Sequence, residues 1–417
     1  MPKTPPSYNR GVQLKLIHGL GILLPGVYLT FTTAYGLSNL LLALCLAFFA
    51  FSINTHWSKG ALSPTAWLML GLYALVLVGM AYTPAPWQWS SINLGKYSKI
   101  ALVVPLMLLF HNRPLLQQRA LWAFAAGMVF VLLSTWLNIW FVLPWSASKT
   151  PGWGVSHHVM YDHIIQNVMM SFFVVFALVQ ADAASHPWLR RTWWVLALLA
   201  ALSITHLSEG RTGLAVLLTA LAVYSAVRLG ARKTLFALPL GVAILALGVM
   251  SSSAMRERIE LGVNEFSNSH TDVFSSIGHR LYNWRTTPQL IAEKPVLGHG
   301  TGAYHTEICR FMDKPEWCDT FRWHPHNQYL YFAADYGLVG LGLYLALIAS
   351  LFVAAHRSQD KSARTLLYAL ASILAVDSLF NSPMFSAKEA EFFLYMMALL
   401  VPMCRQAGPA DDAGKAP

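Results

Sequence analysis

Charged residues are scarce in this chain. Only 12% of its 417 residues are Asp, Glu, Lys or Arg, whereas 56% are hydrophobic and the mean hydropathy is +0.47. A soluble domain carries about 25% charged residues, so this composition excludes a soluble enzyme and a disordered chain. Cysteine is rare as well: the four present are too few for a disulfide-rich secreted scaffold.

Long apolar runs take the place of the missing charge. Runs of about 17–25 apolar residues are long enough to cross a bilayer as helices, and they are too long and continuous for the strands of a membrane barrel. The sequence therefore predicts an all-α polytopic membrane protein with about twelve transmembrane helices. The runs cover residues 13–32, 35–52, 63–82, 97–110, 120–143, 164–182, 192–207, 211–228, 234–251, 327–352, 363–380 and 391–404.

The formal charge of +10 is distributed according to this topology. Of the 29 Lys and Arg residues, 16 fall on the side of the N-terminus and 5 in the short loops of the other side. The remaining eight lie in one long segment that also holds nine acids. The positive-inside rule then predicts that both termini are cytoplasmic. Because topology explains the excess charge, no nucleic-acid partner is expected.

The predicted transmembrane helices are divided unequally by one long segment between them. Transmembrane helices 1–9 are predicted within residues 1–251, and helices 10–12 within 326–404. Residues 252–325 between them form a long extracytoplasmic segment, whose aromatic and apolar residues favour short helices over the mouth of the bundle rather than disorder. Residues 405–417 are small and polar and are expected to form a disordered cytoplasmic tail.

Two of the cysteines, Cys309 and Cys318, fall in the long segment. Oxidising conditions outside the cytoplasm would permit a local disulfide between them, and two free thiols are the alternative. Cys45 and Cys404 lie in apolar runs and are interpreted as packing residues.

Arg211 is the first of three polar features at the expected outer surface. It begins the eighth apolar run, in the stretch His206-Leu-Ser-Glu-Gly-Arg-Thr-Gly213. A cation at a helix N-terminus opposes the helix dipole and needs an anionic partner. Glu209 and a ligand phosphate are both candidates, and a guanidinium binds phosphate oxygens bidentately.

The second feature is Gly278-His-Arg-Leu-Tyr-Asn-Trp-Arg285 in the long segment. Arg280 and Trp284 are one helical turn apart and can face the same surface. A solvated helix face is the alternative interpretation.

The third feature is Trp323-His-Pro-His-Asn-Gln328, where the long segment enters the tenth run. Pro325 is tolerated in a first helical turn and would hold His326 and Asn327 at the membrane surface. An imidazole there could take the proton of a sugar hydroxyl, and a histidine bonded to a loop carbonyl is the alternative. A zinc site is disfavoured because the spacing of the nearby histidines is unspecific. Those histidines are His299, His305, His324 and His326.

Asp377 lies late in the eleventh run, near its outer end. A carboxylate at membrane depth needs a cation or a proton, so Asp377 could orient His326 or pair with one of the arginines.

Together these motifs resemble the O-antigen ligase and polymerase superfamily, most closely the O-antigen ligases of Gram-negative bacteria. The family signature is His, then Asn, Ser or Gln, nine residues, Gly, two residues, and Gly, Thr or Tyr. Here it reads His326-Asn327, nine residues, Gly337, two residues and Gly340.

Both arginines also match the family pattern. The family has an arginine in a Ser-Arg-Thr-Gly-like setting before the long loop, where this chain has Gly210-Arg-Thr-Gly213 and departs only at the residue before the arginine. The family's second arginine lies upstream of a glycine-rich turn, as Arg280 does before Gly298-His-Gly-Thr-Gly302.

The resemblance implies a GT-C-like membrane glycosyltransferase that works without cofactor or metal. Its donor would be O-antigen on undecaprenyl pyrophosphate and its acceptor a hydroxyl of lipid A-core, both in the periplasmic leaflet of the bacterial inner membrane. Arg211 and Arg280 would bind the pyrophosphate and His326 would act as base. Asn327, His324, Arg285 and Asp377 are weaker candidates for supporting roles.

Three alternatives stay open at this point. An O-antigen polymerase and a protein O-oligosaccharyltransferase would use the same kind of donor with another acceptor. A twelve-span transporter would suit the span count, but it would place charges near the bilayer midplane rather than at one rim.

Overall fold

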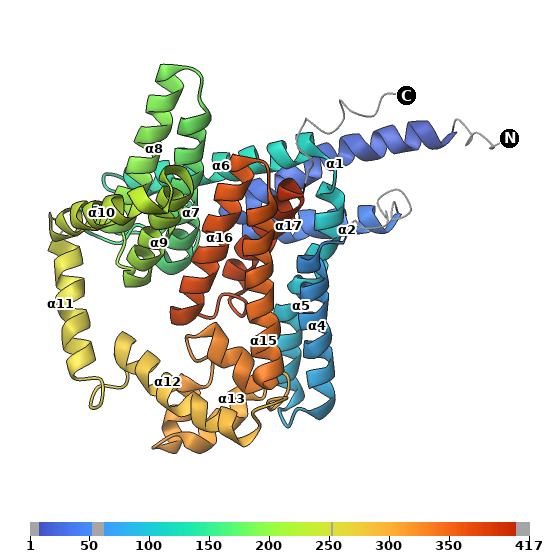
Figure 1. The fold of residues 1–417 in the computed structure, drawn as a ribbon. Helices are drawn as coiled ribbons and strands as arrows, with labels where there is room; N and C mark the ends of the chain where they lie inside the picture. The colour runs from blue at the N-terminus through green and yellow to red at the C-terminus, as the bar shows by residue number, and fades with distance from the viewer. Residues whose placement is uncertain (1–7, 52–61, 252, 406–417) are drawn as a thin grey trace.

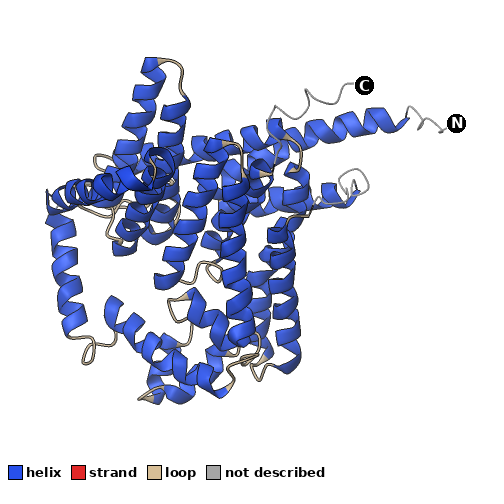
Figure 2. Ribbon diagram, viewed as in Figure 1, coloured by secondary structure: helices blue, strands red, loops and turns tan. Residues whose placement is uncertain are grey.

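The computed structural model describes residues 8–51, 62–251 and 253–405. All the regular secondary structure in these ranges is helical (Figure 2). Before the long segment the helices are α1 (Tyr8–Thr33), α2 (Tyr35–Phe51), α4 (Pro64–Tyr82), α5 (Trp87–Phe110), α6 (Pro114–Leu137), α7 (His163–Ala183), α8 (Pro187–His206), α9 (Arg211–Leu229) and α10 (Ala231–Ser251). After it come α15 (Gln328–Arg357), α16 (Lys361–Phe380) and α17 (Ala387–Cys404).

Each of the twelve predicted apolar runs overlaps one of these helices. Seven of the helices are long and apolar enough to cross a membrane, namely α4, α5, α6, α7, α9, α15 and α16. The described residues therefore form an all-helical, multi-pass membrane protein, and the full count of twelve spans stays a prediction. The fourth run was placed too late, because α5 begins at Trp87 rather than near residue 97.

Local capping explains where several helices begin. The Asp162 carboxylate accepts hydrogen bonds from the Ile164 and Ile165 amides at the head of α7. Asn327 caps α15 in the same way, through a bond from the Leu330 amide to its side-chain oxygen. Such side chains satisfy backbone N–H groups that the first turn of a helix leaves unpaired.

The described residues 253–325, which we call the loop segment, lie at one end of the bundle (Figure 1, yellow to orange). The segment contains α11 (Ser253–Ser267), α12 (Ser276–Glu293), α13 (Tyr304–Glu307), the 3₁₀ turns η1 (Ile308–Phe311) and η2 (Pro315–Trp317), and α14 (Cys318–Phe321). Cys309 and Cys318 are disulfide-bonded. A small apolar cluster of Val273, Tyr282 and Phe321 helps to hold the segment together. The predicted tail at 405–417 lies outside the described residues from residue 406 onward.

The loop segment is anchored to the bundle at a kink in α15. Gly337 has φ 63° and ψ −160°, a backbone conformation that interrupts the helix and is essentially restricted to glycine. Backbone groups freed by the kink bond to the glycine-rich turn instead: the Gly300 amide donates to the Asp335 carbonyl (2.7 Å) and the Leu338 amide to the Pro295 carbonyl (2.8 Å).

The side chain of Asp335 completes this anchor. Its buried carboxylate accepts hydrogen bonds from the Gly302 amide (3.1 Å) and the Tyr304 amide (2.9 Å). A Cβ atom on Gly298 would lie 2.5 Å from the backbone of α15, and one on Gly337 would lie 2.2 Å from the Val296 carbonyl oxygen. Glycines at 298 and 337 are therefore required for the close approach of the turn to α15.

Candidate functional site

Arg211 lies at the head of α9, directed toward the loop segment. Its Nη2 donates to the Glu265 Oε2 of α11 (2.8 Å), while its buried Nη1 has no hydrogen-bond partner among the described residues. Gly262 lets the guanidinium lie against α11, since a Cβ there would be 2.3 Å from Nη1. Of the two partners considered for Arg211, Glu209 pairs with Arg258 instead, and the carboxylate that Arg211 contacts is Glu265.

Arg280 projects from the first turns of α12 toward the C-terminal end of α16. Its Nε donates to the Phe380 carbonyl (3.2 Å), and its Nη1 donates to the carbonyl and hydroxyl oxygens of Ser276 (3.1 and 2.8 Å). The last carbonyls of a helix carry partial negative charge, which suits a guanidinium. Burial and the neighbouring Arg211 charge lower the pKa of Arg280.

His326 lies in the turn before α15 with a left-handed backbone (φ 51°), which is uncommon for a residue other than glycine. Its ring centroid is 4.2 Å from that of His324 and 5.1 Å from that of His279. Burial lowers the pKa of His326, and the neighbouring His324 and Arg280 charges act in the same direction. The imidazole is thus held in its neutral form in the absence of a ligand.

These three side chains, from positions 211, 280 and 326, line one cavity of about 380 Å³. Its other walls come from the head of α7, from α11 and from the start of α12. The full lining is His163, Ile164, Glu209, Gly210, Arg211, Thr212, Arg258, Ser276, His279, Arg280 and His326. We call this the arginine cavity.

A more apolar cavity of about 270 Å³ adjoins it. Arg211 and Arg280 line both cavities, and Trp284 lies one turn from Arg280 on the same side, as the sequence predicted. The remaining lining residues are Thr212, Ala215, Ile277, Leu281 and Phe380. Two guanidinium groups therefore separate an apolar space from a polar one.

Three of the weaker candidates for supporting roles differ in their distance from His326: Asn327 and His324 are near it, and Arg285 is not. Asn327 caps α15 and donates to the Leu379 carbonyl (3.2 Å), so it ties the turn of His326 to the end of α16. His324 stacks near His326 but lines a different cavity. Arg285 is exposed and donates to His270 Nδ1 (2.9 Å), so the structure does not bring it to the arginine cavity.

Asp377 is fully buried in the last turns of α16. Its Oδ1 accepts a hydrogen bond from the Asn381 side chain (2.6 Å). The carboxylate does not line the arginine cavity, although its charge acts on Arg280. These observations favour a role for Asp377 in which its charge acts on Arg280 from outside the cavity, rather than direct contact of Asp377 with a ligand.

Sequence reasoning missed Glu265, Arg258 and His279. Glu265 and Arg258 lie on α11, about 50 residues from the residues with which they pair, and no local spacing indicates such contacts. His279 is adjacent to Arg280, so the same motif contained it, but its orientation toward His326 depends on how α12 docks.

The histidines that were weighed for zinc have other partners. His299 Nε2 lies 2.9 Å from the Leu290 carbonyl oxygen, and the ring of His305 stacks on Trp89 at 4.6 Å. Across the described part of the chain, no three His, Cys, Asp or Glu side chains are grouped so that they could hold a metal ion.

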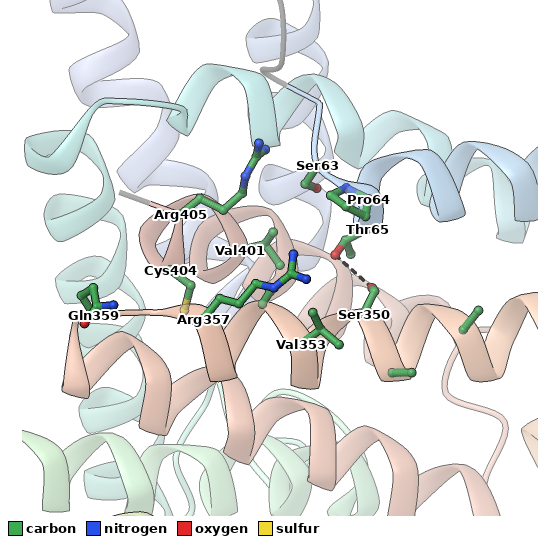
Figure 3. Close-up of a pocket in the computed structure, with 13 residues that line it drawn as sticks. Ser63, Pro64, Thr65, Ser350, Val353, Arg357, Gln359, Val401, Cys404 and Arg405 are labelled. Carbon is green, nitrogen blue, oxygen red and sulfur yellow. Dashed lines mark hydrogen bonds between the residues drawn. The ribbon is translucent and has the colours of Figure 1, made fainter. Parts of the chain in front are cut away.

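A larger cavity, of about 900 Å³, lies at the opposite end of α15, and Figure 3 shows it in close-up. Arg357, Arg405 and Gln359 line it, together with Thr65 and Ser350, whose hydroxyls are 2.9 Å apart. The 30 residues of α15 correspond to roughly 45 Å of helix, so this cavity is remote from His326. Size alone does not identify the site; the clustered cations and imidazoles do.

Comparison with known proteins points to the same region. Residues 195–345, which contain both arginines, the loop segment and the histidine signature, match the family model described as O-antigen ligase. A protein named "Putative polysaccharide ligase" from Rickettsia conorii is 25% identical over 144 residues, which is 33% of this chain and 34% of the relative. One of the same name from Rickettsia bellii is 29% identical over 119 residues, 27% of this chain and 29% of the relative.

The chain thus spans about a third of the length of these curated relatives. The matched region holds the residues on which the resemblance was first based. Residues 195–345 of this protein are therefore similar to an O-antigen ligase-type family, and the two relatives named as polysaccharide ligases support that similarity.

Proposed function

We propose that this protein is an O-antigen ligase of the bacterial inner membrane. It transfers O-antigen polysaccharide from undecaprenyl pyrophosphate to a sugar hydroxyl of lipid A-core at the periplasmic leaflet. The observation that carries the proposal is that Arg211, Arg280 and His326, from three separate parts of the chain, line one cavity.

The two arginines serve the leaving group. As the glycosidic bond breaks, the pyrophosphate gains negative charge, and cations already in place stabilise that charge in the transition state. Arg211 has an unpartnered buried Nη1, and Arg280 is held by backbone oxygens at the end of α16. Because two guanidinium groups supply positive charge, the proposed reaction needs no divalent metal.

The base is His326. A sugar hydroxyl is a weak nucleophile, and removal of its proton in the transition state accelerates attack, typically by about 10²–10⁴-fold. The lowered pKa of His326 keeps the ring neutral before the donor binds, and the negative charge of a bound pyrophosphate would raise that pKa toward the range in which a general base works. Attack from the side opposite the pyrophosphate inverts the configuration of the anomeric carbon.

The apolar cavity suits the lipid part of the donor. Leu281, Trp284 and Phe380 line it beside the two arginines. An isoprenyl chain in this cavity would leave its diphosphate between the guanidinium groups and its first sugar in the arginine cavity. The active site would then face the periplasm, with both termini in the cytoplasm.

A reaction of purified components tests the proposal. The protein is mixed with undecaprenyl-pyrophosphate-linked glycan and lipid A-core, with and without a chelator, and the product is resolved by gel electrophoresis. We expect ligated product in both mixtures and none with the Arg211→Ala or Arg280→Ala variant. Loss of product on adding chelator would contradict the metal-free reaction.

Competing functions give different products in the same system. A polymerase would lengthen the lipid-linked glycan without lipid A-core, and a protein O-oligosaccharyltransferase would require a Ser-containing acceptor. A transporter would move solute into vesicles and would retain that uptake in the His326→Ala variant.

A further inference from the structure

A further cavity adjoins the pair formed by His324 and His326, through His324. It has a volume of about 450 Å³, and two lysines from different helices line it. Aromatic rings form part of its wall. The full lining is Lys96, Asp162, Ile165, Trp323, His324, Phe385, Ser386, Ala387 and Lys388. We call it the lysine cavity.

The charge of the lysine cavity is positive. Lys96 Nζ lies 3.3 Å from the centroid of the Phe385 ring, and Lys388 Nζ lies 4.9 Å from that of Tyr161. The one carboxylate in the lining, Asp162, is engaged by the Ile164 and Ile165 amides (2.9 and 3.0 Å) at the head of α7. Two cations thus face the space, while the anion is partly neutralised by the positive end of a helix.

Aromatic side chains make this positive space suitable for a saccharide. Trp323 and Phe385 line the cavity, and Trp323 packs edge to face against Trp89 (5.3 Å between centroids). Flat apolar rings pack against the C–H faces of sugars, while lysine ammonium groups bind phosphate or carboxylate as point charges. The combination fits sugars that carry acidic groups better than it fits neutral sugars.

The lysine cavity lies close to His326, the proposed base of the transfer reaction. His324 lines the lysine cavity and His326 lines the arginine cavity, with their ring centroids 4.2 Å apart. Displacement with inversion requires the nucleophile and the leaving group on opposite sides of the transferred sugar. An acceptor in the lysine cavity would approach the transferred sugar past this histidine pair, from a different cavity than the one that holds the leaving pyrophosphate.

From this geometry we propose that the lysine cavity binds the acceptor, through phosphate or carboxylate groups on its sugars. The proposal rests on the proposed transferase function and adds to it a location and a charge requirement for the acceptor. Lys96 and Lys388 provide the charge, and Trp323 and Phe385 pack against the sugar rings.

Binding measured in the absence of donor tests this directly. The purified full chain in nanodiscs is titrated with a fluorescent acceptor glycolipid whose core sugars are phosphorylated, and with the same glycolipid after phosphatase treatment. Removing a charge-assisted contact weakens binding by about tenfold or more. We therefore expect Lys96→Gln and Lys388→Gln, each alone, to weaken binding of the phosphorylated glycolipid by about tenfold and to leave the dephosphorylated one unchanged.

Two control variants separate charge from folding. Lys149→Gln removes an exposed lysine that bonds only to the Leu143 and Pro144 carbonyls of its own loop in the described structure, and it should bind like the wild type. Lys96→Arg keeps the positive charge and should retain most of the affinity. The KM for the lipid-linked donor should stay within about twofold in every variant that binds acceptor weakly, which a misfolded variant would not achieve.

The outcomes distinguish this proposal from the proposed function. If both Lys→Gln variants bind the phosphorylated glycolipid as tightly as the wild type does, the lysine cavity is not the acceptor site. The same conclusion follows if their affinity falls equally for the phosphorylated and the dephosphorylated glycolipid. Both conclusions hold whatever the transfer assay shows. Displacement of the glycolipid by phosphatidylglycerol vesicles at equal concentration would overturn it in favour of a general lipid-headgroup site. If the expected binding pattern appears but no transfer product forms, the proposed transfer reaction is wrong, while the lysine cavity is still shown to bind anionic glycolipid.

Discussion

At the scale of single residues, the turn that carries His326 combines backbone strain with a functional side chain. A left-handed conformation at a residue other than glycine persists only where the surroundings hold it. Here the ring of His324 lies beside that of His326. Asn327, the residue after His326, is tied to the end of α16 by its hydrogen bond to the Leu379 carbonyl. The strain thus orients an imidazole toward the arginine cavity.

His326→Asn is the informative substitution at this turn. Asparagine tolerates the left-handed region, so the fold should be retained, while the general base is lost. We expect the transfer rate to fall by about 10²–10⁴-fold with an unchanged apparent melting temperature in detergent. A rate within about tenfold of wild type would rule out His326 as the base.

Glu265 positions Arg211 from α11. Its Oε2 accepts from both the Arg211 guanidinium and the Ile277 amide (3.2 Å), so it links the head of α9 to the start of α12. Glu265→Gln removes the counter-charge and loosens Arg211. We expect kcat to fall by about tenfold while the KM for the donor does not rise, because the arginine cavity becomes more positive.

The matched comparison for Glu265 is Glu260→Gln, which neutralises an exposed carboxylate of the same helix. Its kinetic constants should equal those of the wild type. An equal fall of kcat in both variants would mean that the charge of α11, rather than the contact with Arg211, controls the rate.

At the scale of elements, the kink in α15 joins the loop segment to the bundle. The signature glycine, Gly337, has a structural purpose: it opens the helix so that the glycine-rich turn can bond to it. His326 begins the same signature, so one motif both provides the proposed base and anchors the segment that carries Arg280.

Gly337→Ala should therefore destabilise the protein and reduce transfer together. A side chain at φ 63°, ψ −160° costs about 1–3 kcal/mol, and its Cβ would also meet the Val296 carbonyl. Gly342→Ala, five residues further along α15, has nothing within 4 Å of the new Cβ and should be neutral or stabilising. Thermal unfolding in detergent compares the two, and equal stability of both variants would contradict the role of the kink.

At the scale of the whole molecule, a group of buried and half-buried histidines makes stability depend on pH. Burial lowers the pKa of His279 to about 4, of His305 to about 4 and of His324 to about 3. In the unfolded chain these rings titrate near 6.5. Below that pH the unfolded state binds more protons than the folded state, so stability is complete above about pH 6.5 and declines as the pH falls.

We expect the apparent melting temperature to be lower by roughly 5 °C or more at pH 5 than at pH 7. His279→Gln should reduce this difference, because one buried ring no longer titrates. His186→Gln, at an exposed position, should leave it unchanged. A melting temperature that is independent of pH, or that rises toward acid, would contradict the buried neutral state of these histidines.

The sequence by itself determined the membrane class, because runs of apolar residues have few other stable environments. It also pointed to Arg211, Arg280 and His326, through a family resemblance that rests on the local motifs around them, and their roles stay a prediction. It placed the helices well for the same reason: apolar length and local capping are properties of neighbouring residues.

Only the tertiary structure decided which groups meet. It paired Arg211 with Glu265 rather than Glu209, left Arg285 outside the arginine cavity and brought Lys96 into one cavity with His324. These contacts join residues that lie tens to hundreds of positions apart. Their geometry depends on how helices pack and where α15 kinks, and no spacing along the chain specifies either.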